Sequence, residues 1–504
     1  MTKYSNNFLA HALRLGSVGR EDAPFLFFGD EFQSYADFFE NAEKLASVLV
    51  EHGIQPGDRV AVQVPKARAM LELYFATVLA GAVFLPLNPA YTGHEVSYFL
   101  NDATPTIFIC DPKKLDDLQK IADLARVASV LTLAADESGS LTRKRDASQA
   151  GFIAITRRAD DLAAILYTSG TTGRSKGAML THGALASNSE ALLECWDFTP
   201  SDVLIHALPI FHTHGLFVAT NISLMSGSAC IFMNGFDADA IIDAMPKATV
   251  LMGVPTFYVR LLEQKLLAHA TNGMRLFVSG SAPLLRETHE RWSKITGHAI
   301  LERYGMTETN MNATNPYVGE RRPGTVGFAL PGVELKICNP VTGETLKNGE
   351  VGVLEVRGPN LFQGYWNMPE KTAEELRANG FFITGDLGMI DDDGYLHIVG
   401  RGKDLIISGG LNIYPKEVET LIDDLDGVIE SAVVGVPHSD FGEAVVAVVV
   451  SKTLRSTDVM DALAGNIARY KQPKKVLIVE ALPRNTMGKV QKAELRSRYK
   501  DILL

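Results

Sequence analysis

A glycine-rich loop with hydroxyl side chains and two cations follows an apolar run in the first half of the chain. The run covers Leu162 to Leu166, and the loop reads Tyr167-Thr-Ser-Gly-Thr-Thr-Gly-Arg-Ser-Lys-Gly177. Glycines let a backbone approach a ligand closely, and hydroxyls, backbone N–H groups and cations together hold polyphosphate. The loop is not a Walker A motif, because Lys176 follows a serine rather than a glycine. It predicts phosphate binding at a strand end, and a flexible linker is the weaker alternative.

Three further segments contain residues that suit a nucleotide reaction. The first segment is Glu302-Arg-Tyr-Gly-Met-Thr-Glu308. The hydroxyl of Thr307 can contact a phosphate, and the carboxylate of Glu308 can bind Mg²⁺. Alternatively, Thr307 caps the start of a helix. Asp386, in Thr384-Gly-Asp386, can accept hydrogen bonds from ribose or lie in an ordinary turn. Lys489, in Pro483-Arg-Asn-Thr-Met-Gly-Lys489, can enter the active site of another domain or remain solvated.

Apolar strands and amphipathic helices alternate around these segments. We expect strands at 59–64, 83–87, 106–110, 203–207, 249–252, 276–278 and 298–301, and helices at 66–79 and 113–128. This alternation predicts α/β units with mainly parallel sheets. Ligands bind at the carboxyl ends of such strands, so the loops that follow them should converge on one site.

The residue composition and the expected secondary structure change at two places along the chain. Residues 136–161 are polar and charged and are expected to form an irregular surface excursion. From about residue 333, short strands with Asn-Gly and Asp-Gly turns predict a β-rich subdomain that ends at residue 400. We therefore predict a large N-terminal domain, 1–400 with the subdomain 333–400, and a small mobile α+β C-terminal domain, 401–504.

Composition excludes several classes of protein. The net charge is −11 over 504 residues, without a basic run that could follow nucleic acid or an anionic membrane. The four cysteines are far apart and form no CxxC pair, which favours a reducing cytoplasm over a zinc site or a disulfide framework. The apolar stretch Met70 to Leu87 is broken by Gly81 and Pro86, so we interpret it as a buried helix and a strand rather than a membrane span.

Taken together, the segments resemble the adenylate-forming superfamily, which contains acyl- and aryl-CoA synthetases. The resemblance covers nearly the whole chain and rests on six motifs in order: 167–177, 279–283, 304–308, 384–386, 400–410 and 483–489. It implies that a carboxylate attacks the α-phosphate of ATP-Mg²⁺ to give an acyl-adenylate and pyrophosphate. The thiol of coenzyme A then displaces AMP.

The resemblance also implies a role for each matching residue. Lys489 bridges the attacking carboxylate and the α-phosphate, Thr307 contacts that phosphate, and Glu308 with Thr168 binds Mg²⁺. The remaining ATP-binding residues are Ser169, Gly170, Thr171, Thr172 and Lys176 at the β- and γ-phosphates, Gly280, Ala282, Pro283, Glu302, Arg303 and Tyr304 at the adenine, and Asp386 and Arg401 at the ribose. Lys403 matches the hinge of the C-terminal domain, and Ser408, Gly409 and Gly410 match the segment that approaches coenzyme A.

The acyl substrate is predicted from charge. A short dicarboxylate needs a cation for its distal carboxylate, because burying that charge unpaired is costly. Arg260, one helical turn after Gly253-Val-Pro255, can supply this cation, and Ser281 can share the distal carboxylate. The alternative is that Arg260 is an exposed helix arginine. His212, in Pro209-Ile-Phe-His-Thr-His-Gly215, matches a loop beside the acyl and thiol channel, although it could instead be structural. Segments 206–215, 253–260 and 301–312 resemble malonyl-CoA synthetases, which implies malonate as the principal substrate and methylmalonate as a slower one.

Two other functions stay open at this point. One is an acyl-CoA synthetase for another short-chain or aryl acid, and the other is an inactive nucleotide-binding scaffold. Lys489 and Glu308, which a scaffold is expected to lose, are both present. Acylation of Lys489 would remove its charge and should inhibit the enzyme. The sequence leaves the oligomeric state open.

Overall fold

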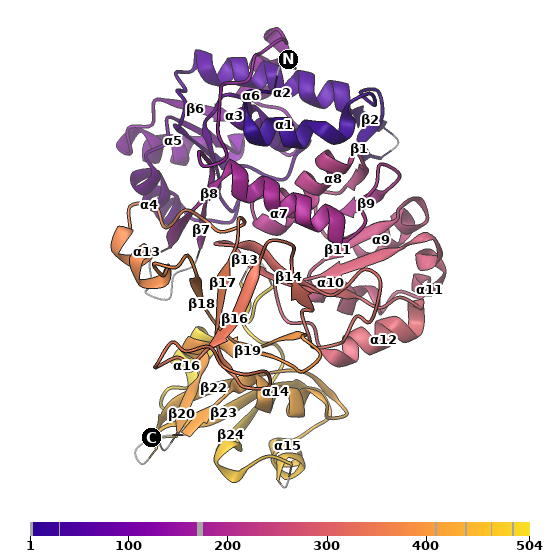
Figure 1. The fold of residues 1–504 in the computed structure, drawn as a ribbon, viewed down its shortest axis with the longest axis vertical. Coiled ribbons are helices and arrows are strands. Elements are labelled where there is room, and N and C mark those ends of the chain that lie inside the picture. Colours follow the sequence, from indigo (N-terminus) through magenta and orange to yellow (C-terminus); the bar gives the residue numbers. More distant parts are fainter. Residues whose placement is uncertain are drawn as a thin grey trace.

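The computed structural model describes residues 4–29, 31–168, 175–408, 411–438, 441–464, 466–485 and 488–503. These residues form four sheets. Two large sheets lie in the N-terminal part, a four-stranded sheet follows them, and a five-stranded sheet lies at the C-terminal end of the molecule (Figure 1). The predicted α/β class with mainly parallel sheets is confirmed.

The six-stranded sheet is parallel except for its last strand, which turns back after the glycine-rich loop. Its strands are apolar on both faces: Val60 and Val62 of one strand pack into the main core, and Ala61 between them packs into a second core. In spatial order the strands are β6 (Ser129–Thr132), β5 (Ile107–Cys110), β3 (Arg59–Gln63), β4 (Val83–Pro86), β7 (Leu162–Thr168) and β8 (Lys176–Thr181).

The nine-stranded sheet has a parallel centre and antiparallel edges. Loops that follow its strands contain Ser281, Thr307 and the start of the 255–261 helix, so the predicted convergence at the carboxyl ends is confirmed for these strands. In order the strands are β15 (Phe328–Ala329), β14 (Asn310–Thr314), β13 (Leu301–Met306), β12 (Leu276–Ser279), β11 (Val250–Gly253), β9 (Val203–His206), β10 (Ala229–Phe232), β1 (Pro24–Phe28) and β2 (Glu31–Ser34).

Helices cover both large sheets, and several begin at residues that favour a helix start. The side chain of Ser34 accepts a hydrogen bond from the backbone of Asp37, and Thr92 and Glu95 form the same capping box. The helices of the N-terminal part are α1 (Phe8–Arg14), α2 (Tyr35–Glu51), α3 (Arg68–Leu79), α4 (Gly93–Ala103), α5 (Leu115–Leu124), α6 (Ser140–Ala147), α7 (His182–Cys195), α8 (Asn221–Ser226), α9 (Ala238–Ala244), α10 (Pro255–Leu261), α11 (Leu267–Ala270), α12 (Arg286–Thr296) and α13 (Pro369–Glu375).

The C-terminal elements are built on two smaller sheets. Two consecutive residues of one long strand, Val445 and Val446, pack into separate cores on the two faces of the five-stranded sheet. The four-stranded sheet contains β16 (Glu334–Cys338), β17 (Gly352–Arg357), β18 (Phe382–Ile390) and β19 (Leu396–Arg401). The five-stranded sheet contains β21 (Leu411–Ile413), β20 (Ile406–Ser408), β23 (Gly442–Ser451), β22 (Val428–His438) and β24 (Lys475–Val479), with α14 (Pro415–Asp423), α15 (Ser456–Leu463) and α16 (Lys492–Tyr499) beside it.

The expectation for residues 136–161 is wrong in part, because this segment contains helix α6. Its Arg145 lies 2.7 Å from the buried carboxylate of Glu72 on α3. This ion pair and the packing of α6 on α2 stabilise a helix that the polar local sequence does not predict.

The apolar stretch Met70 to Leu87 forms most of helix α3 and strand β4, as expected. Among the residues that the structure describes, no helix has the length and apolarity needed to cross a membrane.

Candidate active site

Three strands bring Tyr304, predicted at the adenine, together with Asp386 and Arg401, predicted at the ribose. Tyr304 of β13 donates its hydroxyl to the carboxylate of Asp386 on β18. The Nε of Arg401 lies 2.7 Å from the other oxygen of that carboxylate, and the two residues face each other across the β18–β19 pair. Asp386 is therefore a buried carboxylate with two fixed donors rather than part of an ordinary turn.

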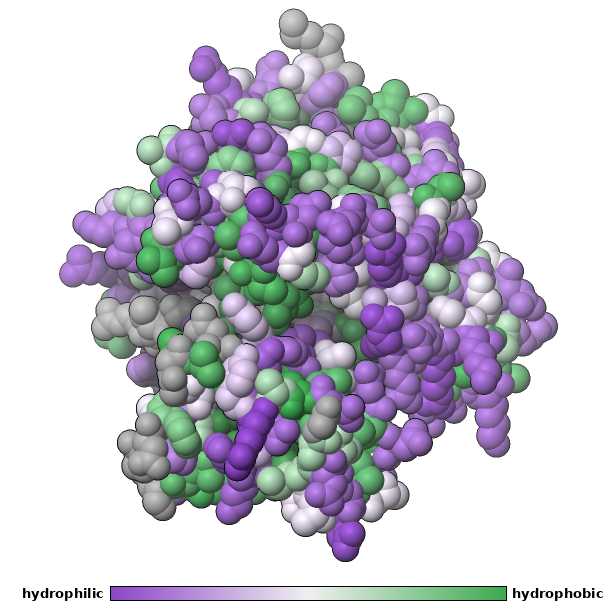
Figure 2. Space-filling view, turned by 60° about the horizontal axis from the view of Figure 1, so that its bottom comes forward, coloured by the Kyte–Doolittle hydropathy of each residue, from purple (hydrophilic) through white to green (hydrophobic). Residues whose placement is uncertain are grey.

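The tip of the loop with Lys489 contacts the N-terminal part. Figure 2 shows a cleft in the surface between the N-terminal and C-terminal parts. The loop is held by hydrogen bonds between Asn485 and Lys489 in both directions, each 2.9 Å long. A Cβ at Gly488 would lie 3.8 Å from the hydroxyl oxygen of Thr256 on α10, so the loop tip contacts the N-terminal part.

Four charged side chains act on Lys489 in this position. Burial among protein atoms lowers the pKa of its ammonium, Arg401 and Arg303 lower it further, and Asp386 and Glu308 raise it. The side chain is nevertheless exposed to solvent. No described carboxylate lies within ion-pair distance of this ammonium, which leaves it able to pair with an incoming anion.

Thr307 and Glu308 occupy the tight turn between β13 and the antiparallel β14. The alternative of a helix start at Thr307 is therefore wrong. Glu308 is buried, which raises the pKa of its carboxyl, and one of its oxygens lies 3.0 Å from the hydroxyl of Tyr365. A buried carboxylate near Lys176 suits Mg²⁺, since this ion takes one or two protein carboxylates and completes its shell with phosphate oxygens and water.

The base of the glycine-rich loop is also defined. Thr168 ends β7 and Lys176 begins β8, and the two residues face each other across the strand pair. The ammonium of Lys176 lies 3.3 Å from Glu375 and 4.0 Å from the ring centroid of Tyr365. Of the predicted phosphate and coenzyme A ligands, Ser169, Gly170, Thr171, Thr172, Gly409 and Gly410 lie outside the described residues.

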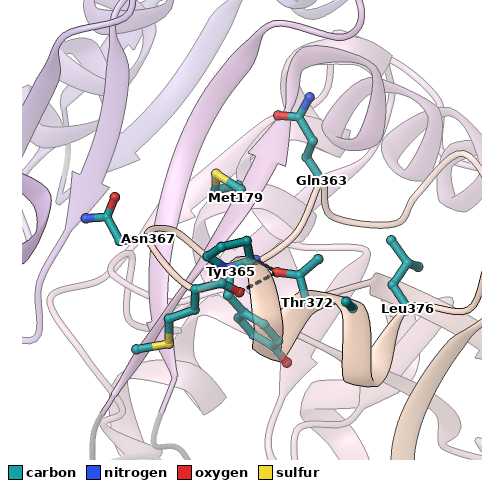
Figure 3. A pocket seen from close by; sticks show the side chains of 9 residues that line it. Met179, Gln363, Tyr365, Asn367, Thr372 and Leu376 are labelled. Carbon is teal, nitrogen blue, oxygen red and sulfur yellow. Dashed lines mark hydrogen bonds between the residues drawn. The ribbon is translucent and has the colours of Figure 1, made fainter.

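Tyr365 and Glu375 were missed by the sequence analysis. Tyr365 lines a pocket of about 450 Å³ together with Met179, Gln363 and Leu376 (Figure 3). The hydroxyl of Tyr365 lies 2.6 Å from Glu375 and joins it to Glu308. No motif marks either residue, because their partners are brought to them only by the fold.

The loop after β12 forms a second, cationic region. Ser281 has a left-handed backbone with φ of 70°, and its hydroxyl oxygen lies 3.4 Å from His214 and 3.5 Å from the guanidinium of Arg303. Arg303 is buried, which lowers the pKa of its guanidinium to about 9. A Cβ at Gly280 would lie 2.4 Å from the Cζ of Arg303, so only glycine leaves space for this side chain. Arg303 thus packs beside Gly280 and points toward Ser281, and its predicted place in the adenine lining stays a prediction.

Two histidines lie beside this cationic region. Burial, and then the charges of Lys489 and Arg303, lower the pKa of His212 to about 3, so its ring is neutral at physiological pH. His214 starts a π-helical segment, His214–Thr220, of the kind that often occurs at functional sites. The region therefore offers a buried cation at physiological pH with neutral hydrogen-bonding groups around it.

Arg260 lies at the exposed end of α10. Its guanidinium is 5.5 Å from the ring of Phe236, which packs at 4.4 Å against Phe257. The structure does not bring Arg260 into hydrogen-bond contact with Ser281 among the residues it describes. Its role as the cation for a distal carboxylate stays a prediction.

The remaining predicted residues lie at the edges of the site. Ala282 and Pro283 follow Ser281 in the loop before α12, and Glu302 is buried in β13, where it accepts a hydrogen bond of 3.3 Å from the backbone of Gly324. Lys403 lies in a single 3₁₀ turn between β19 and β20, and the buried Ser408 ends β20. This short connection is where the chain passes into the C-terminal part.

Two family models match the chain. A model of the AMP-binding enzyme family matches residues 17–366, and a model of the AMP-binding enzyme C-terminal domain matches residues 417–489. Among curated proteins, a malonate–CoA ligase of Arabidopsis thaliana is 36% identical over 483 residues, which cover 88% of this chain and 78% of that protein. A feruloyl-CoA synthase of an Amycolatopsis species is also 36% identical, over 92% of this chain and 94% of that protein.

The fold is similar to that of a solved enzyme over nearly its whole length. The crystal structure of ATP-bound MatB from Rhodopseudomonas palustris has 56% sequence identity and a TM-score of 0.96, covering 99% of this chain and 100% of that one. The apo form of the same protein, with the same identity, has a TM-score of 0.86. The arrangement described above is thus nearer to the ATP-bound form.

Burial of Glu302 makes stability depend on pH. Its pKa is raised from 4.5 to about 8, so between these values the folded protein binds more protons than the unfolded chain and stability falls as pH rises. We expect Glu302→Gln to be more stable than the wild type by about 1–3 kcal/mol at pH 8.5, with a smaller difference at pH 5. Urea unfolding at both pH values measures this. The exposed Glu290→Gln serves as control, and a difference that does not change with pH would contradict the assignment.

Proposed function

This chain belongs to the AMP-binding enzyme family, and we propose that it ligates malonate to coenzyme A with the consumption of ATP. The reaction passes through malonyl-adenylate and gives malonyl-CoA, AMP and pyrophosphate. Methylmalonate is a slower substrate, because one added methyl group changes binding by only about 1–3 kcal/mol. The family membership and the names of the relatives agree with this reaction.

The observation that carries the choice of acid is the buried guanidinium of Arg303. No described carboxylate lies within ion-pair distance of it, and no described residue accepts a hydrogen bond from its Nε. An unpaired buried cation is unstable unless a ligand neutralises it. A fatty or aryl acid brings one carboxylate, which reacts, whereas malonate brings a second that Arg303 and Ser281 can hold. Arg260 at the rim is the second cation for this group.

The first half-reaction places two anions within bonding distance. A carboxylate oxygen of malonate attacks the α-phosphorus of ATP, and pyrophosphate leaves on the opposite side. We assign Lys489 to bridge the attacking oxygen and the α-phosphate, Thr307 to that phosphate, and Lys176 to the leaving pyrophosphate. Mg²⁺, held by Glu308 and Thr168, would neutralise phosphate charge. Positioning and charge neutralisation therefore supply most of the rate, without an acid–base triad.

Asp386 and Arg401 hold the ribose, and the loop at Gly280, Ala282 and Pro283 with Glu302 and Tyr304 lines the adenine. The carboxylate of Asp386 already has two donors in place, so it can accept ribose hydroxyls without reorganising. Neutral His212 can accept a hydrogen bond beside the acyl group without adding charge.

The second half-reaction needs a different arrangement of the C-terminal part. The sulfur of coenzyme A attacks the acyl carbonyl carbon, and AMP leaves. We propose that the C-terminal part rotates about Lys403, which withdraws Lys489 and brings Ser408, Gly409 and Gly410 toward the thiol. The short connection at residues 402–404 and the small contact of the loop tip with Thr256 support such a hinge.

Acylation of Lys489 would block the first half-reaction. The four free cysteines are compatible with a cytoplasmic location.

A panel of acids tests the substrate and the role of the arginines together. We expect rapid pyrophosphate release with malonate and slow release with acetate, butyrate and benzoate. Arg303→Met should raise the KM for malonate by about 100-fold, and Arg260→Ala by about tenfold, because each removes a cation for the distal carboxylate. Pyrophosphate release is measured with and without coenzyme A.

Arg291→Ala, an exposed arginine of α12 paired with Glu263, is the matched control. If Arg260→Ala and Arg303→Met turn over malonate as the wild type does, the assignment of a dicarboxylate is wrong. If no acid of the panel supports pyrophosphate release, the chain is an inactive scaffold instead.

Lys489→Ala separates the two half-reactions. Loss of the bridging cation should slow malonyl-adenylate formation by about 100- to 1,000-fold, whereas thioester formation from supplied malonyl-adenylate should stay within about twofold of the wild type. Single-turnover assays of each step measure both rates, and the exposed Lys452→Ala controls for loss of a C-terminal lysine. Equal loss of both steps would argue against rotation of the C-terminal part.

A further inference from the structure

Lys176, the proposed anchor of pyrophosphate, already has an anionic partner in the protein. Its ammonium lies 3.3 Å and 3.4 Å from the two oxygens of Glu375. Charge-assisted N–H···O bonds are usually about 2.7–2.9 Å long, so this pair is not at its strongest geometry. The side chain of Glu375 is 21% exposed, which leaves it within reach of solvent and of a ligand. The pair is therefore of a kind that a phosphate can replace.

The fold fixes Glu375 beside the phosphate anchor. Residues 363–366 run along β8, with backbone hydrogen bonds of 2.8–3.0 Å to Gly177 and Met179. Helix α13 follows, and its Thr372 accepts a hydrogen bond of 2.9 Å from the backbone of Tyr365 (Figure 3). Glu375 is the last residue of this helix, so the same strand that begins with Lys176 also positions its partner.

A second negative charge lies close to the pair. The hydroxyl of Tyr365 joins Glu375 to Glu308, the proposed Mg²⁺ ligand. Lys371 lies 3.0 Å from Glu375 but also pairs with the exposed Glu374. The polyphosphate of ATP must enter a site that already contains two carboxylates and whose anchoring lysine is occupied.

We propose that Glu375 is an internal counter-anion that competes with the phosphates of ATP and of pyrophosphate for Lys176. This inference rests on the proposed function, since it assumes that Lys176 holds the β- and γ-phosphates. Competition weakens the binding of both ligands, and its benefit is the release of pyrophosphate. Pyrophosphate departs after the first half-reaction, and Glu375 then takes its place on Lys176.

Calorimetric titration of the full chain tests the competition directly. ATP and, separately, pyrophosphate are titrated in EDTA, so that metal binding does not contribute. We expect Glu375→Gln to bind each ligand about three- to tenfold more tightly than the wild type, because one nearby negative charge is removed while the size of the side chain is kept. Glu374→Gln, which removes the same charge from the neighbouring exposed position, should bind both ligands as the wild type does.

Two further measurements separate competition from a positioning role. In a Lys176→Met background, Glu375→Gln should gain much less affinity, because the lysine for which it competes is absent. In turnover assays, Glu375→Gln should be inhibited more strongly by added pyrophosphate, with a lower KM for ATP. Should Glu375→Gln unfold, Glu375→Asp, which withdraws the carboxylate by one methylene, should tighten binding in the same direction.

The outcomes distinguish this inference from the proposed function. If the wild type binds ATP but Glu375→Gln binds it equally or more weakly, Glu375 positions Lys176 instead, and the competition is refuted while the proposed function stands. If the wild type binds neither ATP nor pyrophosphate, both fail. If Glu374→Gln raises the affinity for ATP and pyrophosphate as much as Glu375→Gln does, the effect comes from net charge alone, and this result would also overturn the inference.

Discussion

Charge neutralisation in the cleft between the N-terminal and C-terminal parts is the constraint on which the rest of the structure depends. Four cations and three carboxylates meet there. Arg401 and Lys176 have carboxylate partners, Asp386 and Glu375. Arg303 and Lys489 have none among the described residues, and the pKa of each is lowered by burial. The two unpaired cations mark where the anions of the substrates are expected, and they suit an acid with two carboxylates facing a phosphate.

The fold can be understood as the means of holding these charges. Strands β12 and β13 end next to each other and present Ser281, Arg303 and Thr307 from one edge of the nine-stranded sheet. A separate four-stranded sheet supplies Asp386 and Arg401 on facing strands. Lys489 comes from a third unit through a loop that touches Thr256. Lys489 belongs to the C-terminal part. In the proposed mechanism, this part therefore brings the ammonium into the cleft for the first half-reaction and withdraws it for the second.

The sequence predicted the architecture better than it predicted the side-chain contacts. Apolar runs and glycine-rich loops identified the strands and their convergence, since both follow from local patterns. Tyr304 and Asp386 are 82 residues apart in the sequence, and Lys176 and Glu375 are 199 apart. Pairs at such sequence separations cannot be predicted from local patterns. The role of Tyr304 was predicted only through the family resemblance, whereas for Asp386 the local sequence left ribose binding and an ordinary turn open. The packing of Arg303 against Gly280, where only glycine leaves enough space, could not be predicted from the sequence.

Locking the loop of Lys489 onto α10 tests most directly whether the C-terminal part must move. The ideal Cβ of Gly488 lies 3.9 Å from the Cγ2 of Thr256, a separation that a disulfide in Thr256→Cys/Gly488→Cys can close with a small shift. The account predicts that the oxidised variant forms malonyl-adenylate and pyrophosphate once but no malonyl-CoA, and that reduction restores the thioester step. Malonyl-CoA formation by the oxidised protein at the rate of the reduced protein would contradict it.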